Sequence, residues 1–211
     1  MSGRIFKAAA AIPLLLLAVL AAGCGGRDAG GEEYPRPKGW PRLHDYPADY
    51  IAVAAEAAGQ PLAMEVNSHA ALSRRTGGNG AAWLDIAYPA YGVTVYLTVT
   101  PAASAEEAAE AVENRLERFS LDNPGAAGHT PVASSDGCFR GVISVAAASA
   151  TPVQFVVSNG KNCVVSATAH FSEFSPGDIS RTDSVAPAVD TILRDLLHTI
   201  ESLHTESLES K

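Results

Sequence analysis

Residues 93 to 99 read Val-Thr-Val-Tyr-Leu-Thr-Val, the most regular alternation in the 211-residue chain. Successive side chains of a β-strand point to opposite faces of the sheet, so the valines and the leucine share one face and the threonines and the tyrosine share the other. The stretch from Gly92 to Val99 therefore predicts a strand with one buried face and one exposed face.

Two more strands are predicted on the N-terminal side of this one. Residues 82 to 88 form the nearer of them, and Pro89-Ala90-Tyr91 joins it to the strand that begins at Gly92. Further upstream, residues 62 to 67 read Leu-Ala-Met-Glu-Val-Asn. This alternation is again typical of a half-buried strand.

Two neighbouring segments are less regular. Residues 73 to 80, Ser-Arg-Arg-Thr-Gly-Gly-Asn-Gly, predict a loop because glycine and asparagine dominate their second half. Residues 48 to 58 are open to two interpretations. Their alanines favour a helix, whereas the flanking prolines and Gly59 favour a short or irregular piece.

A helix is predicted after Ser104, which forms a capping box with Glu107. Its apolar face holds Ala108, Val112, Leu116 and Phe119, and its opposite face holds Glu106, Glu110, Glu113 and Glu117. Arginines are interleaved with these acids, so a solvated helix face explains them better than a carboxylate site does. The sequence Asp122-Asn123-Pro124-Gly125 ends the helix.

Three strands and a second helix complete the predicted domain. The strands cover residues 138 to 148, 152 to 158 and 163 to 171, and Asn159-Gly160 predicts a two-residue hairpin between the last two. The helix begins at Asp183 or Ser184, and Pro187 is tolerated in its first turn. It carries an apolar stripe down to Leu203, which is typical of core packing.

This order of elements predicts an α+β fold, a mainly antiparallel sheet covered by two helices. We expect a single layered domain over residues 61 to 205, followed by a frayed polar tail over residues 206 to 211. Cys138 and Cys163 would open the first and third strands of a meander, roughly 10 Å apart. A disulfide needs Cα atoms within about 7 Å. Two buried thiols are therefore favoured, and a disulfide is the alternative.

The N-terminus predicts a lipoprotein. Arg4 and Lys7 precede an apolar run that is shorter than the about 20 residues of a membrane span, which is typical of a signal peptide over residues 1 to 23. The sequence Leu20-Ala21-Ala22-Gly23-Cys24 looks like a lipobox, with alanine at the position where leucine is usual. We expect Cys24 to carry lipid, and residues 24 to 33 to form a flexible tether. Ordinary cleavage that leaves a free cysteine is the less favoured alternative.

Residues 34 to 60 form a segment rich in proline and aromatic residues, which excludes a helix or a central strand over its first half. We expect this segment to be an arm that docks on the domain. The candidate docking residues are Tyr34, Pro35, Pro37, Gly39 and Trp40. Three bases, Arg36, Lys38 and Arg42, form a basic spot that would suit an acidic partner surface.

Composition excludes several function classes. The net charge is -8, and removal of residues 1 to 23 takes away two basic residues and no acid, which gives -10. Such a chain is a poor binder of nucleic acid. Its six histidines are scattered, and no common catalytic, phosphate-binding or dinucleotide-binding motif is present. We therefore expect no enzyme activity, no cofactor and no metal.

Four stretches carry a family resemblance. They are Tyr-Pro-Arg-Pro-Lys-Gly-Trp-Pro-Arg from residue 34, Trp-Leu-Asp-Ile-Ala-Tyr-Pro-Ala-Tyr from residue 83, Ala-Thr-Pro-Val-Gln-Phe from residue 150 and Asp-Ser-Val-Ala-Pro from residue 183. In this order they resemble the gliding-motility lipoprotein GldD family of the Bacteroidetes. The resemblance implies a non-enzymatic lipoprotein of the cell envelope, on the periplasmic side, that is needed for gliding and for type IX protein secretion.

Two functions from different classes stay open. In the first, the protein is an assembly factor of the secretion and motility machinery and contacts other envelope proteins. In the second, it is a periplasmic module that binds a lipid or another small ligand between its sheet and a helix. The many alanines are consistent with either close packing or a cavity.

Overall fold

The computed structural model describes residues 46–57, 60–77, 80–122, 128–146, 149, 151–172 and 182–205. Residues from Arg42 onward form one compact unit. The predicted signal peptide, the tether, the first part of the arm and the tail after Thr205 lie outside the described residues.

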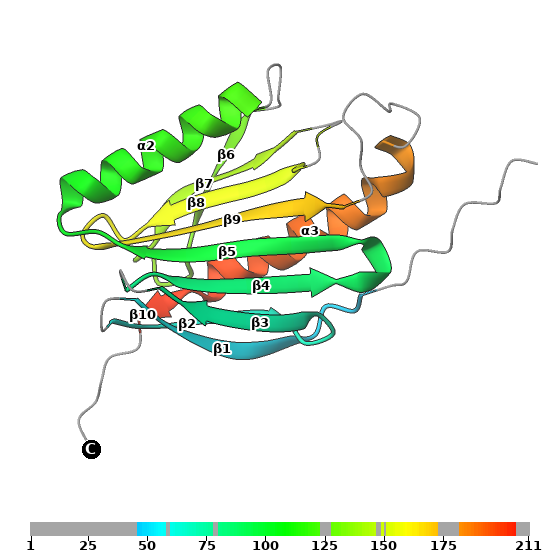
Figure 1. Ribbon diagram of the computed structural model, residues 1–211, viewed down its shortest axis with the longest axis horizontal. Helices are drawn as coiled ribbons and strands as arrows, with labels where there is room; N and C mark the ends of the chain where they lie inside the picture. The colour runs from blue at the N-terminus through cyan, green and yellow to red at the C-terminus, as the bar shows by residue number, and fades with distance from the viewer. Residues whose placement is uncertain are drawn as a thin grey trace, which may run out of the picture. The chain divides into compact units, whose positions relative to one another are not determined.

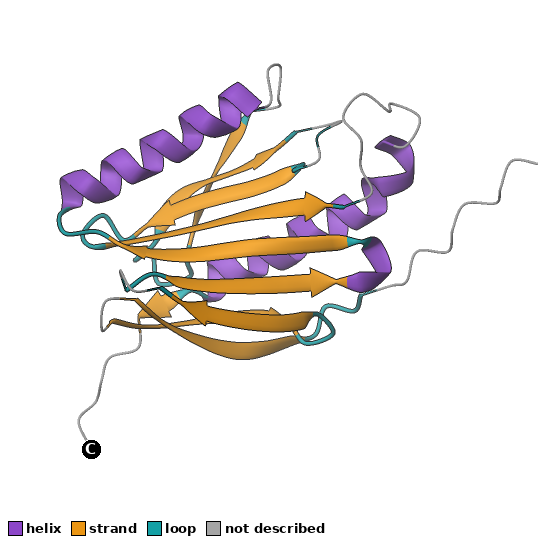
Figure 2. Cartoon of the chain, viewed as in Figure 1, coloured by secondary structure: helices purple, strands orange, loops and turns teal. Residues whose placement is uncertain are grey.

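Most strands belong to one antiparallel sheet, with the order β3-β4-β5-β9-β8-β7-β6 (Figure 1). Its strands are β3 (Ala71–Thr76), β4 (Ala82–Tyr88), β5 (Val93–Pro101), β6 (His129–Ala133), β7 (Arg140–Val145), β8 (Val153–Ser158) and β9 (Cys163–Phe171). The central pair, β5 and β9, joins strands that are far apart in sequence. With two helices beside it, this sheet confirms the predicted α+β fold (Figure 2).

A second sheet is small and also antiparallel. It consists of β1 (Tyr50–Ala57), β2 (Gln60–Asn67) and the two-residue β10 (His204–Thr205). Cα atoms of β1 come within 8 Å of those of β4 and β5, whereas facing sheets usually pack about 10 Å apart. Buried Val53 and partly buried Ala55 are the residues of β1 that pack in or against the main core, and neither has a long side chain.

The helices α2 (Ala105–Asp122) and α3 (Thr182–Ser202) cover opposite faces of the large sheet. Ala108 of α2 packs on Val156 of β8. Ile192 of α3 belongs to the main core together with Phe155 and Val157, the two neighbours of Val156 along the strand. Because consecutive strand residues point to opposite faces, the two helices lie on different sides, as Figure 1 shows.

Several local predictions are confirmed. Strand β4 occupies its predicted range, β5 begins one residue later and ends two residues later than predicted, and the short 3-10 helix η1 (Pro89–Tyr91) joins them. At the start of α2, the Glu107 amide donates to Ser104 Oγ at 3.2 Å. The Glu107 carboxylate accepts from the Ala103 amide at 2.7 Å, one residue earlier than a capping box requires. The predicted apolar stripe is buried from Ile192 in α3 to Leu203, the residue after the helix.

The loop predicted over residues 73 to 80 is wrong in its first half. Residues up to Thr76 form strand β3, which pairs with β4 along its whole length. Its two arginines, Arg74 and Arg75, lie on an edge strand, where charged side chains face solvent and discourage pairing with other chains. Arg75 forms an ion pair with Asp85 at 2.9 Å.

Two other segments are strands that the sequence pattern did not identify. Residues 50 to 57, which were open between a helix and an irregular piece, form β1 and pair with β2. This part of the expected arm therefore belongs to the small sheet. Residues 129 to 133 form β6, an edge strand whose side chains are mostly exposed and which therefore lacks a clear apolar alternation.

The predicted two-residue hairpin at Asn159-Gly160 is also wrong, because four residues separate β8 from β9. The Asn159 side-chain oxygen accepts hydrogen bonds from the amides of Lys161, Asn162 and Cys163, each at 3.0 Å. Gly160 has φ +66°, which glycine adopts without strain. The asparagine side chain thus organises a longer turn than the dipeptide alone predicts.

Both described cysteines are free thiols. Strand β8 separates β7 from β9, as the predicted meander requires. Cys163 is buried, but the burial expected for Cys138 is wrong. Cys138 is exposed because β7 begins only at Arg140, so this cysteine lies in the preceding turn.

Candidate functional site

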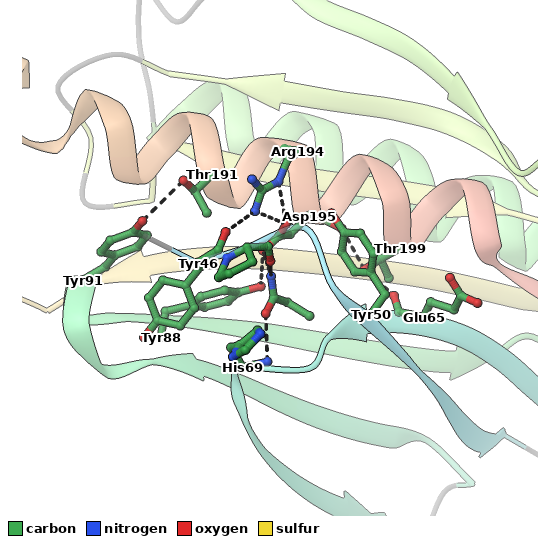
Figure 3. A network of polar contacts seen from close by, with 12 residues as sticks. Tyr46, Tyr50, Glu65, His69, Tyr88, Tyr91, Thr191, Arg194, Asp195 and Thr199 are labelled. Atoms are coloured by element: carbon green, nitrogen blue, oxygen red, sulfur yellow. Dashed lines mark hydrogen bonds and ion pairs between the residues drawn. The ribbon is translucent and has the colours of Figure 1, made fainter. Parts of the chain in front are cut away.

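The buried carboxylate of Asp195 is the centre of a polar cluster between α3 and the two sheets (Figure 3). Its Oδ1 accepts from the Tyr50 hydroxyl at 3.0 Å and from two guanidinium nitrogens of Arg194 at 3.0 and 2.9 Å. Its Oδ2 accepts from the side-chain Nδ2 of Asn67 at 3.0 Å and from the Tyr88 hydroxyl at 3.1 Å. These donors replace the water that the carboxylate loses on burial.

Each donor comes from a different position of the fold. Tyr50 is the first residue of β1, Asn67 is the last residue of β2, and Tyr88 is the last residue of β4. Arg194 precedes Asp195 on α3. One acidic side chain therefore ties both sheets to the helix.

The same cluster holds the chain segment that enters β1. Arg194 donates to the backbone carbonyl oxygen of Tyr46 at 2.8 Å. Asn67 donates to the carbonyl oxygen of Pro47 at 2.9 Å, with the same side-chain nitrogen that it donates to Asp195. The backbone just before β1 is thus fixed to α3 and β2.

The ring of Tyr46 is buried beside the end of β4. It packs edge-on against Tyr88 and Tyr91, with centroids 5.0 and 4.8 Å apart. Its hydroxyl accepts from the Ala90 amide at 3.2 Å. Edge-to-face rings at this spacing attract each other, so Tyr46 anchors the described end of the arm on η1.

The electrostatics of the cluster favour a structural role. Burial, followed by the charge of Asp195 and the hydrogen bond to it, raises the pKa of Tyr88 far above its usual value and also raises the pKa of Tyr50. Burial alone would lower the pKa of Arg194, but the hydrogen bond and charge of Asp195 raise it on balance. A general acid or base needs a pKa near the working pH, and these three groups move away from it.

A second row of contacts continues along α3. The His198 ring stacks on Tyr50 with centroids 3.6 Å apart, and its Nε2 lies 2.7 Å from a carboxylate oxygen of Glu65. Thr199 donates to the Glu65 carbonyl oxygen at 2.9 Å, and the Glu65 amide donates to Ser202 Oγ at 2.9 Å. These bonds hold β2 against α3 over about one helical turn.

None of the predicted site residues is a member of this cluster. Cys24, Tyr34, Pro35, Arg36, Pro37, Lys38, Gly39, Trp40 and Arg42 lie outside the described residues, so their roles stay predictions. Sequence reasoning missed Asp195, although one signal was present. It lies three residues after Ile192 and one before Leu196, which places an acid within the apolar stripe of the helix.

The other face of the large sheet is partly uncovered. Helix α2 contacts β8 and β9, and Figure 1 shows β3, β4 and β5 extending beyond it. We call this part the open face. It carries Arg75, Trp83, Asp85, Thr94, Tyr96, Thr98, Thr168 and His170. Tyr96 is 47% exposed and its ring centroid lies 6.5 Å from that of His170.

The hollows of the domain give little support to a small-ligand module. A cavity of about 100 Å³ lies between β1, β3 and β4, whereas ligand pockets usually measure about 300–1,000 Å³. Two hollows of about 590 and 610 Å³ lie along α2, and both are open to solvent and lined by a mixture of apolar, charged and polar side chains. Among the described residues, no three His, Cys, Asp or Glu side chains could hold a metal. No described helix has the length and apolar character of a membrane span.

The comparison with protein families decides the identity. The model of the family described as gliding motility lipoprotein GldD matches residues 30–205, which is most of the chain. The chain belongs to the GldD family. This match confirms the resemblance of the four stretches, and it includes both the segment before Tyr46 and the described domain. Membership supports a lipoprotein with a role in gliding motility at the cell envelope. No curated protein and no solved structure shows a significant match.

Proposed function

We propose that this lipoprotein is a non-enzymatic accessory or assembly factor for gliding motility and type IX protein secretion. It acts by contacts with other envelope proteins on the periplasmic side of a membrane. Lipid on Cys24 anchors it, and residues 24 to 33 are the tether between the membrane and the folded part. The match to the GldD family supports the role in gliding.

The single observation that carries the mechanism is the attachment of the arm. Arg194 and Asn67 bind the backbone of Tyr46 and Pro47, and the ring of Tyr46 is buried. The segment that carries Arg36 and its neighbouring bases therefore leaves the domain from a fixed point. A recognition segment held at one end loses less conformational entropy when it binds a partner.

Charge indicates the chemistry of the partner. After removal of residues 1 to 23 the net charge of the chain is -10, since the two basic residues lost leave 13 bases against 23 acids. The arm nevertheless carries three bases within seven residues, Arg36, Lys38 and Arg42. We infer that this basic spot meets an acidic protein surface, because opposite charges speed association and orient the partners.

The test is charge reversal in a gliding host. The double variant Arg36→Glu/Lys38→Glu is expected to reduce colony spreading and the release of secreted proteins while the protein level stays normal. The matched control is Arg140→Glu/Lys161→Glu, which reverses two exposed bases of the domain. The control is expected to behave as wild type. Normal spreading and secretion in the arm variant would remove the partner role.

The anchor is tested in the same host by Cys24→Ser, which removes the lipid acceptor. We expect loss of processing and release from the membrane fraction, measured by fractionation and immunoblotting. A normally processed, membrane-bound serine variant would contradict lipidation at this position.

A further inference from the structure

A groove on the outer side of the large sheet runs beside α2. It is the hollow of about 590 Å³ described above, and we call it the α2 groove. One flank of α2 forms its wall, and the strands β5 and β9 form its floor. The wall includes Arg115, Glu117, Arg118 and Leu121, and the floor includes Thr100 and Ser166.

The floor of the α2 groove contains a buried hydroxyl without a partner. The buried polar or charged residues in the described part of the chain are Asn67, Ser134, Ser144, Ser166, Asp195 and Thr199. All of these except Ser166 form side-chain hydrogen bonds. The Ser166 hydroxyl is 7% exposed and forms no side-chain hydrogen bond with a described residue. Burial of a hydroxyl without a hydrogen bond costs free energy, so a ligand that enters from the groove and bonds to Ser166 would remove this cost.

The arginines of the wall have no acidic partner either. Arg115 and Arg118 are exposed, and neither forms an ion pair or a side-chain hydrogen bond with a described residue. Glu117 is the third charged residue of the lining, so the α2 groove carries two positive charges against one negative charge. Without residues 1 to 23, the whole chain has 13 bases against 23 acids. The groove is therefore a positive spot on a negative protein, and it favours an acidic ligand.

The shape of the α2 groove favours a protein segment over a small molecule. The groove is open to solvent, whereas sites for small molecules enclose most of the ligand. From Ala111 to Leu121, which both line the groove, the helix rises about 15 Å. This is the length of about four to five residues of an extended chain. Clustered arginines are a common means of recognising acidic motifs of proteins.

The spacing of the wall residues fits an extended segment. Residues three apart on a helix have Cβ atoms about 5–6 Å apart, which applies to Arg115 and Arg118 and again to Arg118 and Leu121. In an extended segment, side chains on one side are two residues apart, about 6.6–6.8 Å. Two acids at alternate positions can therefore each bond to one arginine. An apolar residue two positions further then lies against Leu121, which is 73% exposed.

We propose that the α2 groove binds an extended acidic segment of a partner protein, with two alternate acids on Arg115 and Arg118 and a following apolar residue on Leu121. The Ser166 hydroxyl donates a hydrogen bond to an oxygen of this segment. The inference rests on the proposed function in that the occupant is a protein, but its surface is separate from the basic spot of the arm. Its test is binding in vitro, whereas the arm is tested by spreading and secretion, so the two can fail independently.

The probe is the synthetic peptide Gly-Asp-Thr-Asp-Thr-Leu-Gly with a rhodamine label. The mature lipoprotein in detergent is titrated into it, and fluorescence anisotropy is measured. We expect saturable binding that weakens as the salt concentration rises, and no binding of a peptide with asparagine in place of both acids. Arg115→Glu/Arg118→Glu should weaken binding at least about tenfold. The matched control Arg140→Glu/Lys161→Glu reverses two exposed bases outside the groove and should bind as the wild type does.

A second variant tests the buried hydroxyl. Ser166→Ala should weaken peptide binding about fivefold, the value of one hydrogen bond. It should leave the urea midpoint of unfolding unchanged or higher, because no hydrogen bond of the free protein is lost. Ser144→Ala removes a buried hydroxyl that contacts His129, so it should lower the midpoint and leave peptide binding unchanged.

Absence of binding up to millimolar peptide would overturn the proposal, as would equal binding by the wild type and by Arg115→Glu/Arg118→Glu. Undiminished binding by Ser166→Ala would overturn the role of the hydroxyl. Inorganic phosphate is a second probe, measured by calorimetry. If phosphate binds the wild type but not the arginine variant, and the peptide binds neither, the groove takes a phosphate group and the acidic protein segment is wrong.

Discussion

The two faces of the large sheet differ in composition and cover. On the inner face, Val95, Leu97 and Val99 of β5 are at most 1% exposed beneath α3 and the small sheet. On the outer face of the same strand, Tyr96 is 47% exposed and only the far end of the sheet packs on α2. Alternate residues of β5 thus point into the core and onto the exposed surface.

The two faces therefore have different roles: the inner face stabilises the domain, and the outer face exposes side chains to solvent. Between the inner face and α3 lies Asp195, the one charged side chain that is buried among the described residues. Its full set of donors joins the helix, both sheets and the end of the arm. The outer face has small alanine contacts under α2 and exposed aromatic residues beyond it. We expect substitutions on the inner face to unfold the domain, and substitutions on the outer face to leave it folded.

The largest effect is expected from Asp195→Ala. It leaves the Tyr88 and Asn67 donors buried without their acceptor and removes the partner of Arg194. Loss of one partner from a buried charged network usually costs about 3–5 kcal/mol. The free energy of unfolding, measured in urea, should fall by this amount. Asp190→Ala, an exposed acid on the same helix, should change it by less than about 0.5 kcal/mol.

The next effect compares neighbours on β5. Leu97→Ala empties a fully buried site and should lower the free energy of unfolding by about 2–5 kcal/mol. Thr98→Ala, one residue away on the outer face, should cost less than about 1 kcal/mol. Similar costs for the two variants would mean that the two faces are not different in burial.

Sequence patterns predicted the inner face better than the edges. The alternation in β5 and the repeat in α3 correctly indicated which residues are buried. An element that is buried on one side has apolar residues at regular intervals along its sequence. Edge strands β3 and β6 expose most of their side chains, so their sequences show no regular spacing of apolar residues. β1 was ambiguous because alanine suits a helix intrinsically, whereas here pairing with β2 decides its conformation.

The Asp195 cluster could be predicted only in part. An acid within the apolar stripe of α3 was a visible signal of a buried charge that needs partners. Its donors lie on β1, β2 and β4, more than 100 residues away, and nothing in the local pattern links them to the helix. Similarly, the sequence predicted an arm that docks through aromatic residues, but the packing of Tyr46 against Tyr88 and Tyr91 could not be predicted from it.

The last effect is smaller and depends on pH. Tyr88→Phe removes a hydrogen bond to a buried carboxylate, which should lower the free energy of unfolding at pH 7 by about 1.5–3 kcal/mol. Burial and Asp195 raise the pKa of Tyr88 in the folded state, so the folded protein keeps the phenol proton when the unfolded chain loses it above pH of about 10. The wild-type protein therefore loses stability as pH rises through this range, and Tyr88→Phe lacks that loss. At pH 11 the difference between the two proteins should be smaller by about 1.4 kcal/mol, one pKa unit of linkage. Leu97→Ala removes no titrating group, so its cost should be equal at pH 7 and pH 11. If Tyr88→Phe also costs the same at both, the pKa of Tyr88 is not raised in the folded protein, which contradicts a buried hydroxyl bonded to Asp195.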